Sequence, residues 1–242
     1  MRILILLLIG CFSNASQEIP WGAQKLLKAY PNAISHYKDN KLFFTDGSSL
    51  VYDDGKVKST KELLENPDIE DQFKWKYSTP GTNDAGRIRN EAFFKKLYGN
   101  SKEEVAKKLV EIVWCPKLVN QKIKVTSVNG IDKKIQKISA ELEQHPELKP
   151  YITNIGGTFN WRKIAGTNRL STHSFGMTMD INTKFSNYWQ WDCKCTNEEV
   201  KLTYKNRIPK KIIAIFEKHG FIWGGNWHHY DSMHFEYRPE FF

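Results

Sequence analysis

Residues 171–180 read STHSFGMTMD and place His173 and Asp180 seven residues apart, with Gly176 between them. On a straight strand these two side chains would point to opposite faces. A turn or bulge at the glycine would bring both to one side. Imidazole nitrogens and carboxylate oxygens are ligands of divalent metal ions. The stretch therefore indicates part of a metal site.

Residues 221–236, FIWGGNWHHYDSMHFE, supply a third candidate ligand in His234. Three protein ligands with an open fourth position are typical of catalytic zinc sites. Asp231 precedes His234 by three residues, so a tight turn would place its carboxylate beside the metal, where a general base has to lie. Together the two clusters predict a hydrolytic metal centre.

Other residues of the second cluster leave alternatives open. His228 or His229 could be the third ligand in place of His234. Glu236 follows His234 by two residues, on the same face of any strand there, and could support a ligand or be the base itself.

The motifs S-x-H-x-x-G-x-x-x-D and D-x-x-H-F-E resemble the zinc D-alanyl-D-alanine carboxypeptidases, a family that includes vancomycin-resistance D,D-peptidases and phage L-alanyl-D-glutamate endolysins. The likeness spans residues 156–236. It implies that Zn²⁺ is bound by His173, Asp180 and His234. It also implies that Asp231 is the catalytic base, and an aspartate there is more similar to the endolysin branch.

The resemblance suggests further site residues. Family members often have an arginine upstream of the first motif that stabilises the tetrahedral intermediate. Arg162 is the candidate, and Arg169 is the alternative. Ser171, Trp227 and Tyr230 are expected to position the substrate.

The N-terminus predicts export. After Arg2, the apolar run 3–9 and the small residues up to Ala15 are typical of a secretory signal peptide that is cleaved after Ala15. Residues 8–11, LIGC, resemble a lipobox, so lipoprotein processing at Cys11 is an alternative. We expect a periplasmic or extracellular protein.

Export bears on the cysteines. Removal of the signal would leave Cys115, Cys193 and Cys195, an odd number that cannot pair fully within one chain. We expect one disulfide from Cys115 to Cys193 or Cys195, or free thiols.

Composition narrows the class of protein. The 242 residues are 40% hydrophobic, which excludes a disordered chain, and no apolar run reaches the ~18 residues of a membrane span. The formal net charge of +9 favours an anionic partner. For an exported protein, that partner is a cell-wall polymer and not nucleic acid.

Periodicity predicts the main elements. Residues 42–55 read as a hairpin-rich stretch, and residues 87–113 look helical with Ser101 as an N-cap. Further helices are expected over about 132–144 and 209–219. The soft boundary near residue 116 ends the first part of the chain.

These observations predict an α+β fold in which a small antiparallel sheet carries the zinc ligands and helices pack against it. The expected organisation is a signal peptide over 1–15, a helical and hairpin-rich extension over 16–116 and a zinc peptidase domain over 117–242. The expected activity is hydrolysis of a D-Ala-D-Ala or an L-Ala-D-Glu bond in peptidoglycan stem peptides. The alternatives are an inactive wall-binding protein that retains the fold and a zinc-bound signalling or adhesion protein. The sequence specifies no oligomeric state.

Overall fold

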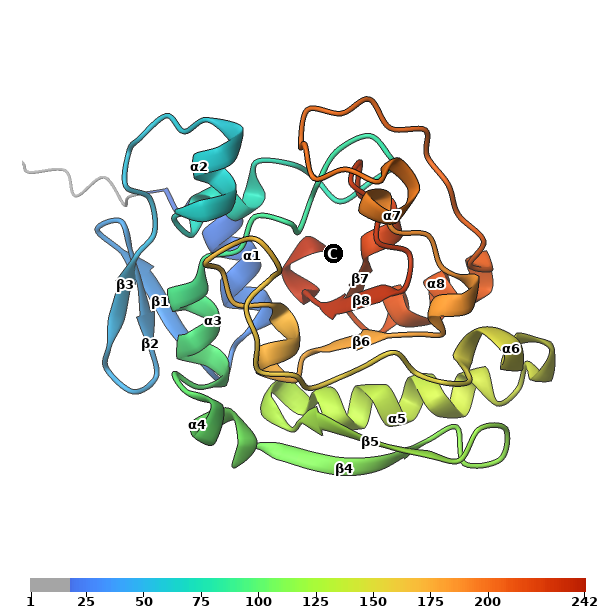
Figure 1. The fold of residues 1–242 in the computed structure, drawn as a ribbon. Helices are drawn as coiled ribbons and strands as arrows, with labels where there is room; N and C mark the ends of the chain where they lie inside the picture. Colours follow the sequence, from blue (N-terminus) through green and yellow to red (C-terminus); the bar gives the residue numbers. More distant parts are fainter. Residues whose placement is uncertain (1–17) are drawn as a thin grey trace, which may run out of the picture.

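The computed structural model describes residues 18–242, so the predicted signal segment and Cys11 lie outside the described residues. The fold is α+β, as predicted (Figure 1). The helices are α1 (Trp21–Ala29), α2 (Thr60–Glu65), α3 (Glu91–Tyr98), α4 (Lys102–Ala106), α5 (Ile131–Leu142), α6 (Lys149–Ile152), α7 (Trp189–Cys193) and α8 (Lys210–Lys218). The strands are β1 (Ile34–Lys38), β2 (Lys41–Phe44), β3 (Ser49–Val51), β4 (Leu109–Trp114), β5 (Gln121–Thr126), β6 (Thr178–Asp180), β7 (Phe221–Trp223) and β8 (His234–Tyr237). Within residues 18–242, no helix combines the length and the apolar character needed to cross a bilayer.

A small antiparallel sheet in the order β6-β8-β7 forms the centre of the C-terminal half (Figure 1). Helix α8 packs on this sheet and buries Ile212, Ile215 and Phe216. The Phe216 ring stacks on Phe235 of β8 with 3.9 Å between ring centroids. Burial of such large side chains contributes roughly 1.5–3 kcal/mol each, so the sheet has a firm support on this side.

The N-terminal segment packs against the end of the chain. Strands β1, β2 and β3 form a second antiparallel sheet. The β2–β3 pair confirms one hairpin within residues 42–55, whereas the turn signal at residues 53–55 is followed by helix α2 and not by a strand. Helix α1 lies against residues 239–241, and the Tyr30 hydroxyl donates to Glu240 at 2.7 Å. One continuous hydrophobic cluster includes residues of both halves. The N-terminal segment is therefore part of the same packed body as the β6-β8-β7 sheet.

The predicted helix over 87–113 is wrong in its last third. Helices α3 and α4 are present, and the Ser101 side chain caps α4 as expected. The following residues form strand β4 instead, which pairs antiparallel with β5 from Leu109 to Trp114. Ile112 and Trp114 are buried while Glu111 and Val113 are exposed, which is the period of two expected of a strand.

The predicted boundary near residue 116 falls between these two paired strands. The division into residues 16–116 and 117–242 stays a prediction. Helices α5 and α8 confirm the two helices expected in the C-terminal half.

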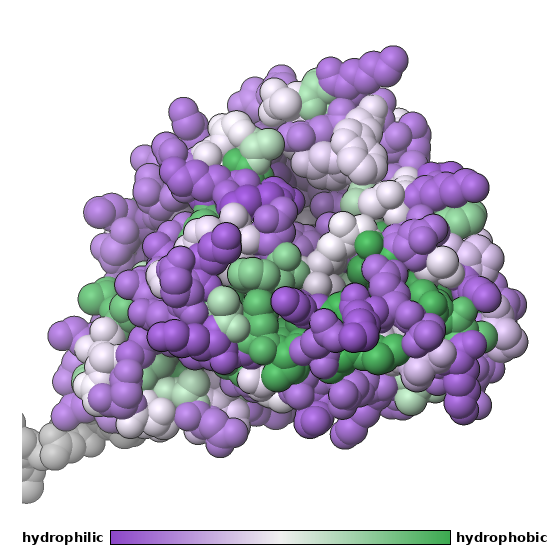
Figure 2. Space-filling view, turned by 60° about the horizontal axis from the view of Figure 1, so that its bottom comes forward, coloured by the Kyte–Doolittle hydropathy of each residue, from purple (hydrophilic) through white to green (hydrophobic). Residues whose placement is uncertain are grey.

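Most of the face that includes the β4–β5 side of the molecule is hydrophilic, in keeping with the charged composition (Figure 2). A band of apolar side chains crosses this face (Figure 2). On the hairpin itself, Val113 is 39% exposed and Leu109 and Val110 are partly buried.

Candidate metal centre

A tight turn brings the two residues of the first motif together. His173 lies in a 3₁₀ turn, Thr172–Phe175, in which the Ser171 hydroxyl accepts a hydrogen bond from the His173 backbone N–H at 3.4 Å. Gly176 ends the turn with φ of 65°, a left-handed conformation that favours glycine. The chain then enters β6, at whose end Asp180 lies. The expectation that the glycine would turn both side chains to one side is confirmed.

Strand pairing adds the third side chain. His234 begins β8 and lies directly opposite Asp180 in the sheet register. One oxygen of Asp180 is 3.1 Å from His173 Nε2, and the other is 3.2 Å from His234 Nδ1. The three ligand atoms lie within 4.8 Å of one another. The fold thus gathers two nitrogens and one carboxylate around a single point.

Both imidazoles are held by their second nitrogen. His173 Nδ1 is 2.8 Å from the Thr158 carbonyl oxygen, so a neutral ring donates there and leaves Nε2 as a metal ligand. His234 Nε2 is 3.2 Å from Glu236 Oε2, which leaves Nδ1 facing Asp180 in the same way. This donor set fits a divalent ion such as Zn²⁺.

The electrostatics also favour a cation. Burial opposes charge on His234, but hydrogen bonds to Asp180 and Glu236 raise its pKa to about 9. Burial likewise opposes ionisation of Asp180, yet His173 and His234 hold the pKa of that carboxyl well below its usual range. The Asp180 carboxylate is therefore kept ionised between the two imidazoles, as a metal ligand has to be.

Asp231 lies one turn before the third ligand, and its backbone carbonyl accepts from the His234 N–H at 3.2 Å. Its Oδ1 atom is buried and has no hydrogen-bond partner among the described residues. Burial raises its pKa; His234 opposes this and Asp180 adds to it, with a net value of about 6. An unpartnered buried carboxylate beside three ligands is suited to accept a proton from a reactant.

Both carboxylate oxygens of Glu236 have hydrogen-bond partners. It is fully buried, and its two oxygens accept from Arg89 and from Arg238 as well as facing His234. Burial opposes ionisation, but Arg89, together with His234 and Arg238, holds its pKa well below the usual range. The sequence left open whether Glu236 supports a ligand or is the catalytic base. Its contacts with His234 and the two arginines are those of a residue that supports a ligand.

The two arginine candidates differ in their surroundings. Arg162 is exposed, and its guanidinium donates to the Lys163 carbonyl at 3.4 Å. Its backbone is docked on the first motif, since its N–H donates to Ser174 Oγ at 3.0 Å. Arg169 instead lies 3.3 Å from Glu65, in a cavity shared with the N-terminal segment. Of the two side chains, that of Arg162 is the more exposed to solvent.

The residues expected to position a substrate are all buried. Ser171 caps the 3₁₀ turn, as described above. The indole N–H of Trp227 donates to the Ala85 carbonyl at 2.7 Å, and its ring lies 5.4 Å from that of His234. Tyr230 donates to Asp192 at 2.8 Å. Of the three, Ser171 contacts His173 and Trp227 lies beside His234, while the contact given above for Tyr230 is to Asp192.

The neighbouring histidines are bound elsewhere. His229 Nδ1 lies 2.7 Å from Asp84, and its Nε2 lies 2.9 Å from the Glu198 carbonyl. His228 Nδ1 lies 3.4 Å from the Gly81 carbonyl. Within residues 18–242, His234 belongs to a group of side chains that could hold a metal. His228 and His229 belong to no such group within the same residues.

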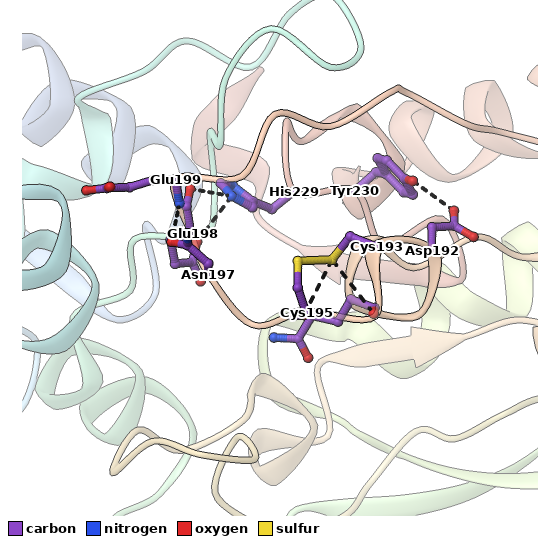
Figure 3. Close-up of a disulfide and its surroundings, with 9 residues drawn as sticks. Asp192, Cys193, Cys195, Asn197, Glu198, Glu199, His229 and Tyr230 are labelled. Atoms are coloured by element: carbon purple, nitrogen blue, oxygen red, sulfur yellow. Dashed lines mark hydrogen bonds and ion pairs between the residues drawn. A yellow bond between two sulfur atoms is a disulfide. The ribbon is translucent and has the colours of Figure 1, made fainter.

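The cysteine prediction is wrong. Cys193 and Cys195 form a disulfide with each other at the end of α7 (Figure 3). Cys115 is free and buried. Cys115 cannot reach them, because it packs under α5, where its backbone N–H donates to Ser139 at 2.7 Å. The disulfide lies between the Asp192–Tyr230 and Glu198–His229 contacts (Figure 3).

A second group of carboxylates already has a cationic partner. Asp54, Asp68 and Asp71 all contact the ammonium group of Lys58, at 2.9, 2.8 and 2.6 Å. The Lys58 side chain is only 6% exposed. The lysine fills the position that a cation would take in this acidic group.

Comparison with known proteins identifies the segment that contains the centre. Residues 165–237 match a family model described as D-alanyl-D-alanine carboxypeptidase. The matched segment includes His173, Asp180, Asp231 and His234, and it begins after Arg162. No curated protein and no solved structure matches the chain.

Proposed function

We propose that this peptidase of the D-alanyl-D-alanine carboxypeptidase family is an exported zinc enzyme that cleaves stem peptides of peptidoglycan. The observation that carries the proposal is the trio His173, Asp180 and His234 with the unpartnered carboxylate of Asp231 beside it. A binding protein would have no use for a buried carboxylate that lacks a partner, because such a group destabilises the fold.

The mechanism assigns a step to each residue. Zn²⁺, when bound by the three ligands, supplies Lewis acidity that acidifies water and polarises a carbonyl group. Asp231 accepts the proton of the attacking water at Oδ1 and then delivers it to the leaving amine. Arg162 shares the negative charge that develops on the carbonyl oxygen. Thr158 and Glu236 keep the two imidazoles in the required tautomers.

The charge of the site supports the substrate class. A divalent ion with one carboxylate and two neutral imidazoles has a net charge of about +1, which favours a peptide that bears a carboxylate. The positive charge of the whole chain favours association with an anionic wall. The scissile bond is D-Ala-D-Ala or L-Ala-D-Glu, and both occur in the stem peptide.

The test is hydrolysis of purified muropeptides by the chain from residue 16 onward, with products identified by mass. Metal analysis should find about one zinc per chain, and a chelator should abolish turnover. Release of D-Ala identifies a carboxypeptidase, and cleavage after L-Ala identifies the endopeptidase. The matched control is Asp231→Asn, which should retain zinc and lose hydrolysis. Zinc-loaded protein that gives no product would favour the wall-binding alternative and overturn the proposal.

A further inference from the structure

A chain of buried charged groups connects the N-terminal segment with the third candidate ligand. Glu236 and Arg238 are fully buried, although each carries a charge. Arg238 Nη1 donates to Glu236 Oε1 at 3.1 Å, and its Nε donates to Glu240. Glu240 in turn accepts from Tyr30, at the end of α1. Burying such charges is costly unless each is paired, and here each of them has a partner of opposite charge.

Arg89 donates hydrogen bonds to Glu236 Oε2, the oxygen that faces His234. Its Nη2 donates to Glu236 Oε2 at 2.6 Å, and its Nε lies 3.1 Å from both carboxylate oxygens. The same Oε2 is the atom 3.2 Å from His234 Nε2. Arg238 holds the other oxygen, so the carboxylate is fixed from two directions.

A second contact leads from Arg89 to the same histidine. The Arg89 guanidinium lies over the Trp227 ring, 5.4 Å from its centroid. That ring is in turn 5.4 Å from the imidazole of His234. Arg89 therefore limits the movement of His234 through a carboxylate on one side and through an indole on the other.

The position of Arg89 is itself well defined. It lies directly before α3, whose N-cap Asn90 accepts from the Phe93 N–H at 2.8 Å and donates to the Pro67 carbonyl at 2.8 Å. Ile88, on the other side, is 1% exposed. A capped helix start and a buried neighbour anchor the backbone from which the guanidinium extends.

We propose that Arg89 is a positioning residue of the metal centre. It orients Glu236 so that the carboxylate accepts a hydrogen bond from the Nε2–H of His234, which keeps the proton on Nε2 and leaves Nδ1 for the metal. The inference rests on the proposed zinc function, and it gives the N-terminal segment a part in that function. Partners of this kind typically change metal affinity by about 10–100-fold when they are removed.

The test compares metal binding by the full chain carrying Arg89→Gln, Arg89→Lys or Arg87→Gln. Arg87 is the matched control, because it belongs to the same stretch but pairs with Asp84 and Glu198 instead of Glu236. Zinc affinity is measured by competition with a chelator, and the ligand geometry by the visible absorption of the Co²⁺ form. Arg89 lines a cavity of about 220 Å³, which gives water room to replace part of the side chain.

Arg89→Gln should weaken zinc about 10–100-fold and shift the Co²⁺ bands, while Arg87→Gln leaves both close to wild type. Arg89→Lys keeps the charge but loses the paired donors, so we expect an intermediate loss. If Arg89→Gln does not fold, the zinc affinity of Arg89→Lys relative to that of Arg87→Gln decides. If wild type binds zinc and the Arg89 variants have the same zinc affinity as Arg87→Gln, this inference alone is overturned. Wild type that binds neither metal would overturn the proposed function and this inference with it.

Discussion

Replacing Asp231 by asparagine should make the metal-free protein more stable at neutral pH. Burial and the neighbouring Asp180 raise the pKa of Asp231 from 3.8 to about 6, against the opposing effect of His234. That rise costs the ionised carboxylate up to about 3 kcal/mol in the folded state. Asparagine has nearly the same shape and does not ionise, so the Asp231→Asn protein avoids this cost.

The sign and the pH window follow from proton linkage. Below pH 3.8 the carboxyl is protonated in both the folded and the unfolded chain, and it contributes no difference. As the pH rises from 3.8 to about 6, the folded state keeps a proton that the unfolded state loses, so the stability of wild type falls. The advantage of Asp231→Asn should be under about 1 kcal/mol at pH 4 and reach up to about 3 kcal/mol at pH 8.

The assay is urea unfolding at both pH values in the presence of a chelator. For a chain of this size, a gain of about 3 kcal/mol corresponds to a melting temperature higher by about 6–12 °C. Asp84→Asn is the matched control, and it should change the stability at pH 8 in the opposite direction. Burial opposes its ionisation, but His229 and Arg87 lower the pKa of Asp84 to about 2, so this substitution should destabilise at pH 8. Equal stability of wild type and Asp231→Asn at pH 8, or a gain that is the same at pH 4, would refute the reasoning.

Three further substitutions test other parts of the structure. Arg162→Ala should lower kcat about 10²–10³-fold with unchanged zinc affinity, and a rate near wild type would remove it as the oxyanion donor. Gly176→Ala should reduce stability and zinc affinity together, since φ is 65° and the added Cβ would lie 2.6 Å from Leu109; an unchanged melting temperature and zinc titration would contradict this. Lys58→Met should cost about 1–3 kcal/mol in urea unfolding at pH 7, because Asp68 and Asp71 lose their ammonium partner, and less at pH 3; a pH-independent cost would count against this explanation.

The grouping of His173, Asp180 and His234 could be predicted because metal chemistry restricts both residue type and spacing. Two histidines and an aspartate, separated by a glycine turn and paired across two strands, have few uses other than binding a cation. The pairing of Asp180 with His234 was the one part that needed the fold. The catalytic roles themselves stay predictions.

Arg89 could not be found in this way. Its partner Glu236 is 147 residues away, and no local pattern marks an arginine that will be paired across such a distance. The stretch RIRNE over residues 87–91 lies outside the two motifs, and nothing in it indicates a partner for the arginine. A long-range ion pair of this kind can be identified only once the fold is known.

Strand β4 and the disulfide were missed for related reasons. Val105, Leu109 and Ile112 satisfy a helical period, while Ile112 and Trp114 also satisfy the period of a strand. Pairing with β5 decides between them, and the residues themselves do not. Cysteine spacing likewise leaves pairing open, because it says nothing of which sulfurs the fold brings together.

The Arg89–Glu236 pair also sets an order of events during synthesis. At 5–20 residues per second, roughly 7–30 s separate the appearance of these two residues. Throughout that interval the arginine lacks the carboxylate that pairs with it in the folded protein, and for nearly all of it the histidine that it will help to orient has not been synthesised. The centre is therefore among the last parts of the molecule to be assembled, and a chain that stalls before residue 234 contains the N-terminal sheet but no complete ligand set.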